Sequence, residues 1–159
     1  MGVTRSKDAS TLMRERYVEI WPKILDPWTQ YLIAARSAFD GDMDKMLVLA
    51  VIGAMSLQDK GFPLRDPAPH SYDDLLSPNA TALEPRPINI ESIALFTGIP
   101  RESVRRKVLD LMARKWVART AQGYLVVLPA AAVDLEALSA QLFRLIGQIN
   151  SAIDDSMKV

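Results

Sequence analysis

The chain has 159 residues, no cysteine, a single histidine and equal numbers of acidic and basic residues, 19 of each. This length suits one domain, or a small domain with flanking helices, and an apolar content of 49% is typical of a globular chain. The absence of cysteine excludes disulfides, thiolate metal sites and cysteine nucleophiles, and one histidine excludes a multi-histidine metal site.

The N-terminal segment, residues 1–42, is predicted to be helical after a frayed tail at residues 1–9. Pro22 predicts a kink or an end of the first helix, because proline lacks the backbone N–H and clashes with the preceding turn. Asp26 followed by Pro27 predicts that a second helix starts here, with the aspartate as its cap.

Four aromatic side chains recur along this segment: Tyr17, Trp21, Trp28 and Tyr31. They are a candidate pocket for a small-molecule effector, since aromatic ligands bind between such helices in many proteins. Aromatic residues at helical spacing on a long helix more often form a core or a subunit contact, because each buries a large apolar area. We therefore expect a dimerisation surface here and keep the effector pocket as the alternative.

The helix predicted over residues 43–58 is apolar nearly all round, which predicts a buried first core helix. Asp40, Asp42 and Asp44 lie before and at its start. Together with Asp26 they are interpreted as helix caps and breakers rather than as a metal cluster.

A proline-rich linker is predicted over residues 59–87, which contain six of the ten prolines and His70. The prolines prevent a regular helix across the linker, although residues 72–76 are long enough for one helical turn. A connection of this length is unusual inside a compact domain, and we expect an ordered loop on the surface. His70 is interpreted as a solvated side chain.

Residues 88–128 are predicted to fold as helix, turn, helix and two-stranded hairpin. Asn89 is a suitable cap for the first helix, and Gly98 supplies a left-handed residue after it. Pro100 suits the start of the second helix, and Gly123 permits the positive φ that the hairpin needs. Apolar positions at helical spacing are expected to face the core: Ile90, Ile93, Ala94, Thr97, Val104, Val108, Leu111 and Met112.

This stretch, about forty residues, resembles the winged helix-turn-helix of bacterial transcription regulators, especially the GntR and MarR groups. The segment from Thr97 to Arg106 is the most similar part, and it matches the turn and recognition-helix start of GntR-type domains. The chain departs from that pattern at Pro100, which replaces a Ser or Thr cap, at Glu102, which replaces a neutral polar residue, and at Lys115, where many members have glycine. The resemblance implies a mainly α fold (α+β), with a winged helix-turn-helix core and long N- and C-terminal helices.

The resemblance also implies which residues bind DNA. Bases or nearby phosphates would be contacted from the start of the recognition helix by Arg101, Ser103 and Arg105. The DNA backbone would be held by Arg106, Lys107 and the wing tip, which is formed by Gln122 and Gly123.

The charge distribution supports a nucleic-acid partner independently. Residues 101–119 contain seven basic and two acidic residues, which is an electrostatic footprint for nucleic acid, and the alternative is an ordinary solvated helix face. Glu102 would repel phosphates unless it pairs with Arg106 or accepts a hydrogen bond from a cytosine amine.

The C-terminal segment, residues 129–159, is predicted to form a last helix from about Asp134 to near Asp155. Its apolar residues repeat at heptad spacing: Leu135, Leu138, Leu142, Leu145, Ile149 and Ala152. A helix this apolar needs a partner, and we expect the aromatic N-terminal helix to be that partner, in the same subunit or across a two-fold axis. MarR-type regulators dimerise through N- and C-terminal helices in this way.

We therefore expect a homodimeric, sequence-specific transcription regulator that binds double-stranded DNA. The alternative is a winged helix that contacts protein and not DNA, with Leu95 and Phe96 as an exposed apolar patch. Otherwise the linker, the N-terminal helix or a second subunit must cover these two side chains.

We expect no enzyme and no cofactor, because the sequence contains no glycine-rich phosphate loop, nucleophile elbow or metal-ligand spacing. No secretory signal is visible, and the longest apolar run, residues 46–57, is too short to span a bilayer. We therefore expect a soluble bacterial protein of the cytoplasm with no membrane partner.

Overall fold

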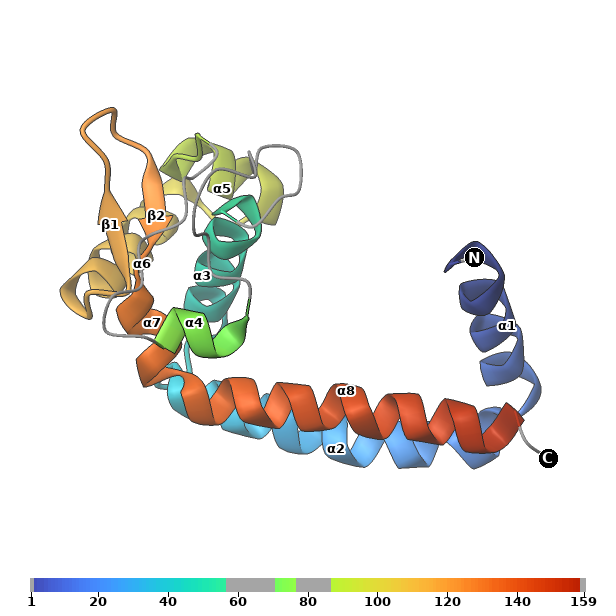
Figure 1. Cartoon of the computed structure of the whole chain (residues 1–159). Coiled ribbons are helices and arrows are strands. Elements are labelled where there is room, and N and C mark those ends of the chain that lie inside the picture. Colours follow the sequence, from blue (N-terminus) through green and yellow to red (C-terminus); the bar gives the residue numbers. More distant parts are fainter. Residues whose placement is uncertain (1, 57–70, 77–86, 158–159) are drawn as a thin grey trace. The chain divides into compact units, whose positions relative to one another are not determined.

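The computed structural model describes residues 2–56, 71–76 and 87–157. The described chain is mainly helical with a small antiparallel sheet, and it divides into two compact units, residues 1–38 with 137–159 (unit 1) and residues 39–136 (unit 2). Figure 1 labels the elements. Their bounds are α1 Gly2–Glu15, α2 Tyr17–Ala38, α3 Met43–Ser56, α4 Tyr72–Leu76, α5 Ile90–Thr97, α6 Arg101–Ala113, β1 Val117–Arg119, β2 Leu125–Val127, α7 Pro129–Asp134 and α8 Glu136–Met157.

In unit 1, α2 packs against α8 through a buried apolar cluster. Ile20 and Ile24 of α2 meet Ala152 of α8 in this cluster. At the same end, Nη1 of Arg16 donates a hydrogen bond to the carbonyl oxygen of Ser156 at 2.6 Å. The predicted packing of the N-terminal helix against the C-terminal helix is therefore confirmed within one chain.

Two predictions for unit 1 are wrong. Residues 2–9 of the predicted frayed tail are instead part of α1, and α2 runs through both of its prolines, so no new helix starts at Asp26. A proline inside a helix costs about 3 kcal/mol. Burial of Ile20 and Ile24, on either side of Pro22, stabilises the helix by roughly 1.5–3 kcal/mol each. Packing therefore outweighs the local effect of the proline.

The core of unit 2 is formed by α3, α5, α6 and the hairpin. The inward positions predicted from helical spacing are confirmed as buried or half-buried. Helix α3, predicted to be a buried core helix, buries one side at Val48 and Ile52, whereas Leu47 on its other side is 43% exposed. The fully buried side chains of these elements are Val48, Ile52, Ile93, Val104, Val108, Leu111, Val117 and Leu125.

The hairpin pairs β1 and β2 antiparallel, with Val117 opposite Val127 and Arg119 opposite Leu125. Trp116 and Tyr124, which also have a strand-like sequence, precede the two strands. The N–H of Leu125 donates to the carbonyl oxygen of Ile88 at 2.9 Å. This bond ties the residues before α5 to the free edge of β2.

The connecting segments agree with the sequence in part. The single turn predicted over residues 72–76 is confirmed as α4, and the hydroxyl of Tyr72 donates to the carbonyl oxygen of Ala132 in α7 at 3.4 Å. His70 and most of the predicted linker lie outside the described residues. The last helix begins at Glu136 and not at about Asp134 as predicted, because Leu135 is not helical and separates α7 from α8.

Candidate nucleic-acid interface

The turn between α5 and α6 is held by local hydrogen bonds. The side chain of Asn89 accepts from the N–H of Ser92 at 2.9 Å, which confirms the predicted cap of α5. Gly98 has φ of 73°, the left-handed conformation predicted for it. The N–H of Ile99 donates to the hydroxyl of Thr97 at 3.2 Å, and Pro100 precedes α6 without a side-chain cap. These contacts fix where the first turn of α6 begins.

One side of α6 carries exposed residues, four of them charged, and we call it the outer surface: Arg101, Glu102, Arg105, Arg106 and Leu109. It lies opposite Val104 and Val108, which are fully buried. Arg101 and Arg106 are exposed, and neither forms an ion pair with another described residue. Two guanidinium groups on this surface are therefore available to an anionic partner.

Glu102 and Arg105 form a close ion pair on the outer surface. Nε of Arg105 donates to both carboxylate oxygens of Glu102 at 3.0 Å, and Nη2 donates to Oε1 at 2.6 Å. These hydrogen bonds lower the pKa of Glu102, with the charges of the nearby arginines adding to the effect, and they raise the pKa of Arg105. Glu102 thus pairs with Arg105, whereas the sequence had offered Arg106 or a cytosine amine as its two possible partners.

A second polar side of α6 faces the loop before α3, and we call it the inner surface: Lys107, Asp110 and Arg114. Nζ of Lys107 donates to both carboxylate oxygens of Asp42 at 2.9 and 2.8 Å. Asp110 pairs with Lys45, and Arg114 pairs with Asp40. Every member of the inner surface therefore has an oppositely charged partner within unit 2.

Asp42 has a double role at this contact. Its Oδ1 accepts from the N–H of Lys45 at 2.9 Å, which caps α3 as the sequence predicted, while both oxygens accept from Lys107. Partial burial acts to raise the pKa of Asp42, but the hydrogen bonds and charges of Lys107 and Lys45 outweigh it and lower the pKa. The ionised carboxylate is therefore the form that the fold stabilises.

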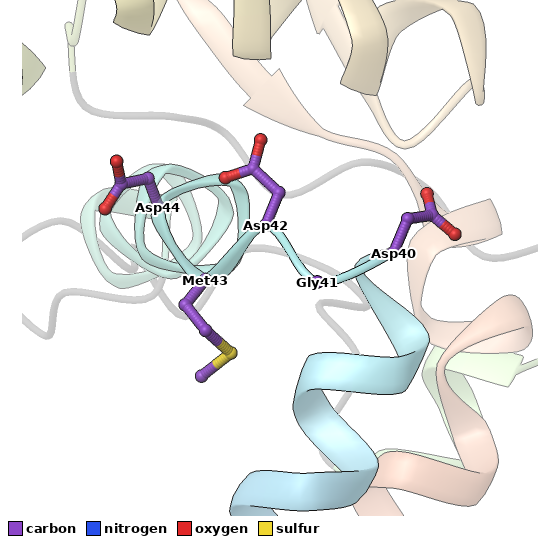
Figure 2. Close-up of a pocket in the computed structure, with 5 residues that line it drawn as sticks. All are labelled: Asp40, Gly41, Asp42, Met43 and Asp44. Carbon is purple, nitrogen blue, oxygen red and sulfur yellow. The ribbon is translucent and has the colours of Figure 1, made fainter.

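Two hollows border this contact. One, of about 360 Å³, is lined by Ser103 and Arg106 together with the charged residues Asp42, Lys45, Lys107 and Asp110. The other, of about 480 Å³, lies over the loop from Asp40 to Asp44. Figure 2 shows Asp40 and Asp42 pointing to the same side of that loop and Met43 to the opposite side. Among the described residues no group of three or more acidic or histidine side chains is placed to hold a metal ion.

Trp116 lies just after the end of α6, next to Arg114 of the inner surface. Its ring lies edge-on to Phe39 with centroids 5.7 Å apart, and the guanidinium of Arg114 lies 5.0 Å from the ring centroid. Its Nε1 donates to Asp134 at 2.7 Å. The chain enters unit 2 at Phe39 and leaves it after Glu136. Both ends of unit 2 are thus anchored near one tryptophan.

The tip of the hairpin is exposed at Gln122, and Gly123 has φ of 87°, as predicted. The N–H of Gly123 donates to the carbonyl oxygen of Thr120 at 2.9 Å, and the N–H of Tyr124 donates to the Thr120 hydroxyl at 3.1 Å. These bonds hold the tip in a single turn.

The aromatic residues of α2 lie in unit 1. Tyr17 stacks on Trp21 with centroids 5.8 Å apart, and Trp28 lies tilted to Tyr31 at 6.2 Å. Tyr31 is buried, which raises the pKa of its hydroxyl, whereas Tyr17 and Trp28 are largely exposed.

The structure thus separates the residues that the sequence grouped as DNA contacts. Arg101 and Arg105 lie on the outer surface, Arg106 belongs to that surface but also lines the smaller hollow with Ser103, and Lys107 is held by Asp42. Sequence reasoning missed the partners of the inner surface. The only signal for them was the cluster of aspartates before α3, which we interpreted as caps and breakers.

Comparisons of this chain with protein-family models, with curated proteins and with solved structures found no match. A search of the described helices for one long and apolar enough to cross a bilayer also found none.

Proposed function

We propose that this chain is a sequence-specific DNA-binding regulator of transcription. It acts as a homodimer and uses α5, α6 and the hairpin as a winged helix-turn-helix. The observation that carries the proposal is the outer surface of α6, where Arg101 and Arg106 are exposed and unpaired among the described residues. Unpaired guanidinium groups on an exposed helix bind phosphates and guanine edges.

The local architecture supports this proposal. A helix, a three-residue turn and a second helix precede an antiparallel hairpin, and the hydrogen bond from Leu125 to Ile88 adds the segment before α5 to the sheet edge. A tight turn of this kind, with Gly98 in the left-handed conformation, is what helix-turn-helix domains use to present the start of the second helix to a groove.

The proposal is tested by selecting bound DNA from a random pool at near-physiological salt and titrating the selected site at several salt concentrations. Arg101→Ala combined with Arg106→Ala should weaken binding at least tenfold and reduce the salt slope by about two, one for each lost phosphate contact. A matched control, Lys23→Ala with Arg36→Ala, removes two exposed cations from α2. If wild type shows no salt-dependent DNA binding, the proposal is wrong.

A second candidate function is protein contact through α5. Leu95 and Phe96 are 84% and 64% exposed, which is unusual for large apolar side chains on adjacent positions. Replacing both with serine should leave DNA binding unchanged if the first proposal holds. The second candidate function is favoured if wild type binds a protein partner but no DNA, and if the variant with both serines no longer binds that partner.

The homodimer rests on apolar side chains that a single chain leaves exposed in unit 1. They are Tyr17, Val18, Leu25, Trp28, Leu32 and Ile33 on α2, with Phe143 and Ile146 on α8. Sedimentation at micromolar concentration should give about twice 17.7 kDa. Ile146→Glu should yield a folded monomer, and the control Gln148→Glu, on the other side of α8, should remain dimeric. A wild-type monomer would contradict the dimer.

A further inference from the structure

The ion pair between Glu102 and Arg105 leaves specific hydrogen-bonding groups unused. The pair engages Nε and Nη2 of the guanidinium, and no bond of Nη1 to Glu102 is formed. An arginine has five N–H donors, so the edge formed by Nη1 and Nη2 still presents a two-pronged donor. The carboxylate can accept about four hydrogen bonds, and from the described residues Oε2 receives only the shared bond from Nε.

These unused groups match the edge of a G·C base pair. In the major groove guanine presents two acceptors, O6 and N7, which an arginine fork contacts together, whereas cytosine presents an amine that a carboxylate accepts. Both members of the pair are half-exposed or more, with side-chain exposures of 50% for Arg105 and 64% for Glu102. They also lie in the first turns of α6, where recognition helices approach bases.

We propose that Glu102 and Arg105 act as one specificity-determining unit that selects guanine and an adjacent or paired cytosine in the bound DNA. This inference rests on the proposed function. Arg105 donates its outer edge to guanine, and Glu102 both holds that guanidinium in place and accepts from the cytosine amine.

The charge of the pair explains why it would recognise bases rather than phosphates. Together the two side chains carry no net charge, so phosphates attract the pair little, and the carboxylate by itself repels them. Arg101 and Arg106 flank Glu102 closely enough to lower its pKa through their charges. The outer surface therefore divides into flanking cations that bind phosphate and a neutral central pair that contacts base edges.

The alternative is that the pair only stabilises the helix, as many ion pairs three residues apart do. Both interpretations predict that Glu102 and Arg105 interact in the free protein. They differ in what happens to base preference when the carboxylate is removed.

The experiment compares wild type with Glu102→Gln, which keeps the shape of the side chain and removes its charge. DNA is selected from a random pool with each protein, and the wild-type site is then resynthesised with single-group changes. A 7-deazaguanine removes N7 from one guanine, and a 2-pyrimidinone removes the amine from one cytosine. The matched control is Glu91→Gln, which makes the same change at an exposed position in the first turn of α5.

The inference predicts that wild type loses on the order of tenfold in affinity at one guanine and one cytosine substituted in this way. Glu102→Gln keeps one acceptor oxygen for Arg105 and presents an NH2 donor in place of the other, so it should become much less sensitive to the missing cytosine amine. It should also bind random DNA more tightly, with a salt slope steeper by about one. Glu91→Gln should keep the wild-type base preference and the sensitivity to both analogues.

Two outcomes would overturn the inference, and they can be told apart. If Glu102→Gln selects the same sequence as wild type and responds equally to both analogues, the pair only stabilises the helix, and DNA binding itself stands. If wild type selects no sequence and binds no DNA, the proposed function fails and the inference fails with it. Equal melting temperatures of the variants and wild type exclude misfolding as the cause of either result.

Discussion

The two polar surfaces of α6 carry the same kinds of residue in opposite states. On the inner surface Lys107 and Arg114 are matched by Asp42 and Asp40 and are mostly shielded, with side-chain exposures of 17% and 27%. On the outer surface the cations are exposed, and in the described part of the chain only Arg105 is paired, with its own neighbour in the helix. The inner charges join elements far apart in sequence and contribute to the fold, whereas the outer charges are available to a partner.

This difference changes what the charge count means. Residues 101–119 carry a local excess of five positive charges in sequence, which indicated a basic face. Two of those cations are neutralised by aspartates from the loop before α3. The surface that an anion would meet is therefore smaller than the count suggests, and it is concentrated at the first two turns of α6.

The largest loss of stability is expected from replacing Trp116, which lies next to Arg114 of the inner surface. Trp116→Ala removes the contact with Phe39 and leaves Asp134 without its indole donor. Truncation of a buried tryptophan costs about 3–5 kcal/mol, so urea unfolding should show a loss of this size. Trp116→Phe keeps a ring beside Phe39 and should lose only about 1.5 kcal/mol, the net contribution of one hydrogen bond to the carboxylate of Asp134, which is exposed and can be hydrated instead. Equal losses in the two variants would show that the ring contact contributes nothing.

The next effect compares the two surfaces directly. Asp42→Ala removes the cap of α3 and leaves Lys107 partly buried without its partner, at a cost of about 2 kcal/mol. Asp44→Ala is the matched control, because Asp44 is an exposed aspartate in the first turn of the same helix. Thermal unfolding should separate them by several degrees.

The same measurement on the outer surface should give almost nothing. Glu102→Ala breaks an exposed ion pair, which solvent screens, so its melting temperature should stay within about 1 °C of wild type. If Glu102→Ala destabilises the protein as much as Asp42→Ala does, the two surfaces do not differ as we describe.

Asp42 should also change how the unfolding free energy depends on pH in acid, by less than the loss expected for Asp42→Ala. Its pKa is lower in the folded protein than the ordinary value of 3.8, so the folded state binds this proton more weakly than the unfolded chain. The stability that the carboxylate contributes is complete above the ordinary pKa and is lost as the pH falls through the folded pKa. Below about pH 4, the unfolding free energy of Asp42→Asn should therefore fall less steeply with decreasing pH than that of wild type. An Asp42→Asn curve parallel to wild type would refute the assignment.

The predictable parts of the fold were those with a local cause. Asn89, Gly98 and Gly123 have the conformations or bonds that their residue types favour, and the spacing of Val104 and Val108 identified the buried face of α6. These features depend on residues a few positions apart, which a sequence shows directly.

The features that the sequence did not predict depend on distant partners. Helix α2 continues through Pro22 because Ile20 and Ile24 pack with Ala152, more than a hundred residues away. Lys107 is separated by 65 residues from Asp42, and nothing in the spacing of the aspartates before α3 indicates which cation each one meets. The sequence could place cations on α6, but only the packing of α3 against α6 decides which of them remain exposed.

A small gain in stability is expected at Lys115, which follows α6 and belongs to neither surface. It adopts φ of 60°, the left-handed conformation, at the position where winged-helix sequences often have glycine. An L side chain in this conformation costs roughly 1–2 kcal/mol, which glycine would avoid. Glycine also has greater freedom in the unfolded chain, and this offsets about 0.4–1 kcal/mol of the gain. Lys115→Gly should therefore stabilise the protein by about 0.5–1 kcal/mol, measured by urea unfolding.

The opposite sign is expected at the neighbouring control. Ala113 is the last residue of α6, so Ala113→Gly should destabilise the protein by about 0.5–1 kcal/mol. Lys115→Gly also removes one of the seven cations of residues 101–119 without touching the outer surface. If the exposed arginines and not the overall charge bind phosphate, the salt slope of DNA binding should stay as in wild type. A slope reduced by about one unit would mean that Lys115 itself contacts the backbone, and that the cations which bind DNA extend beyond the outer surface.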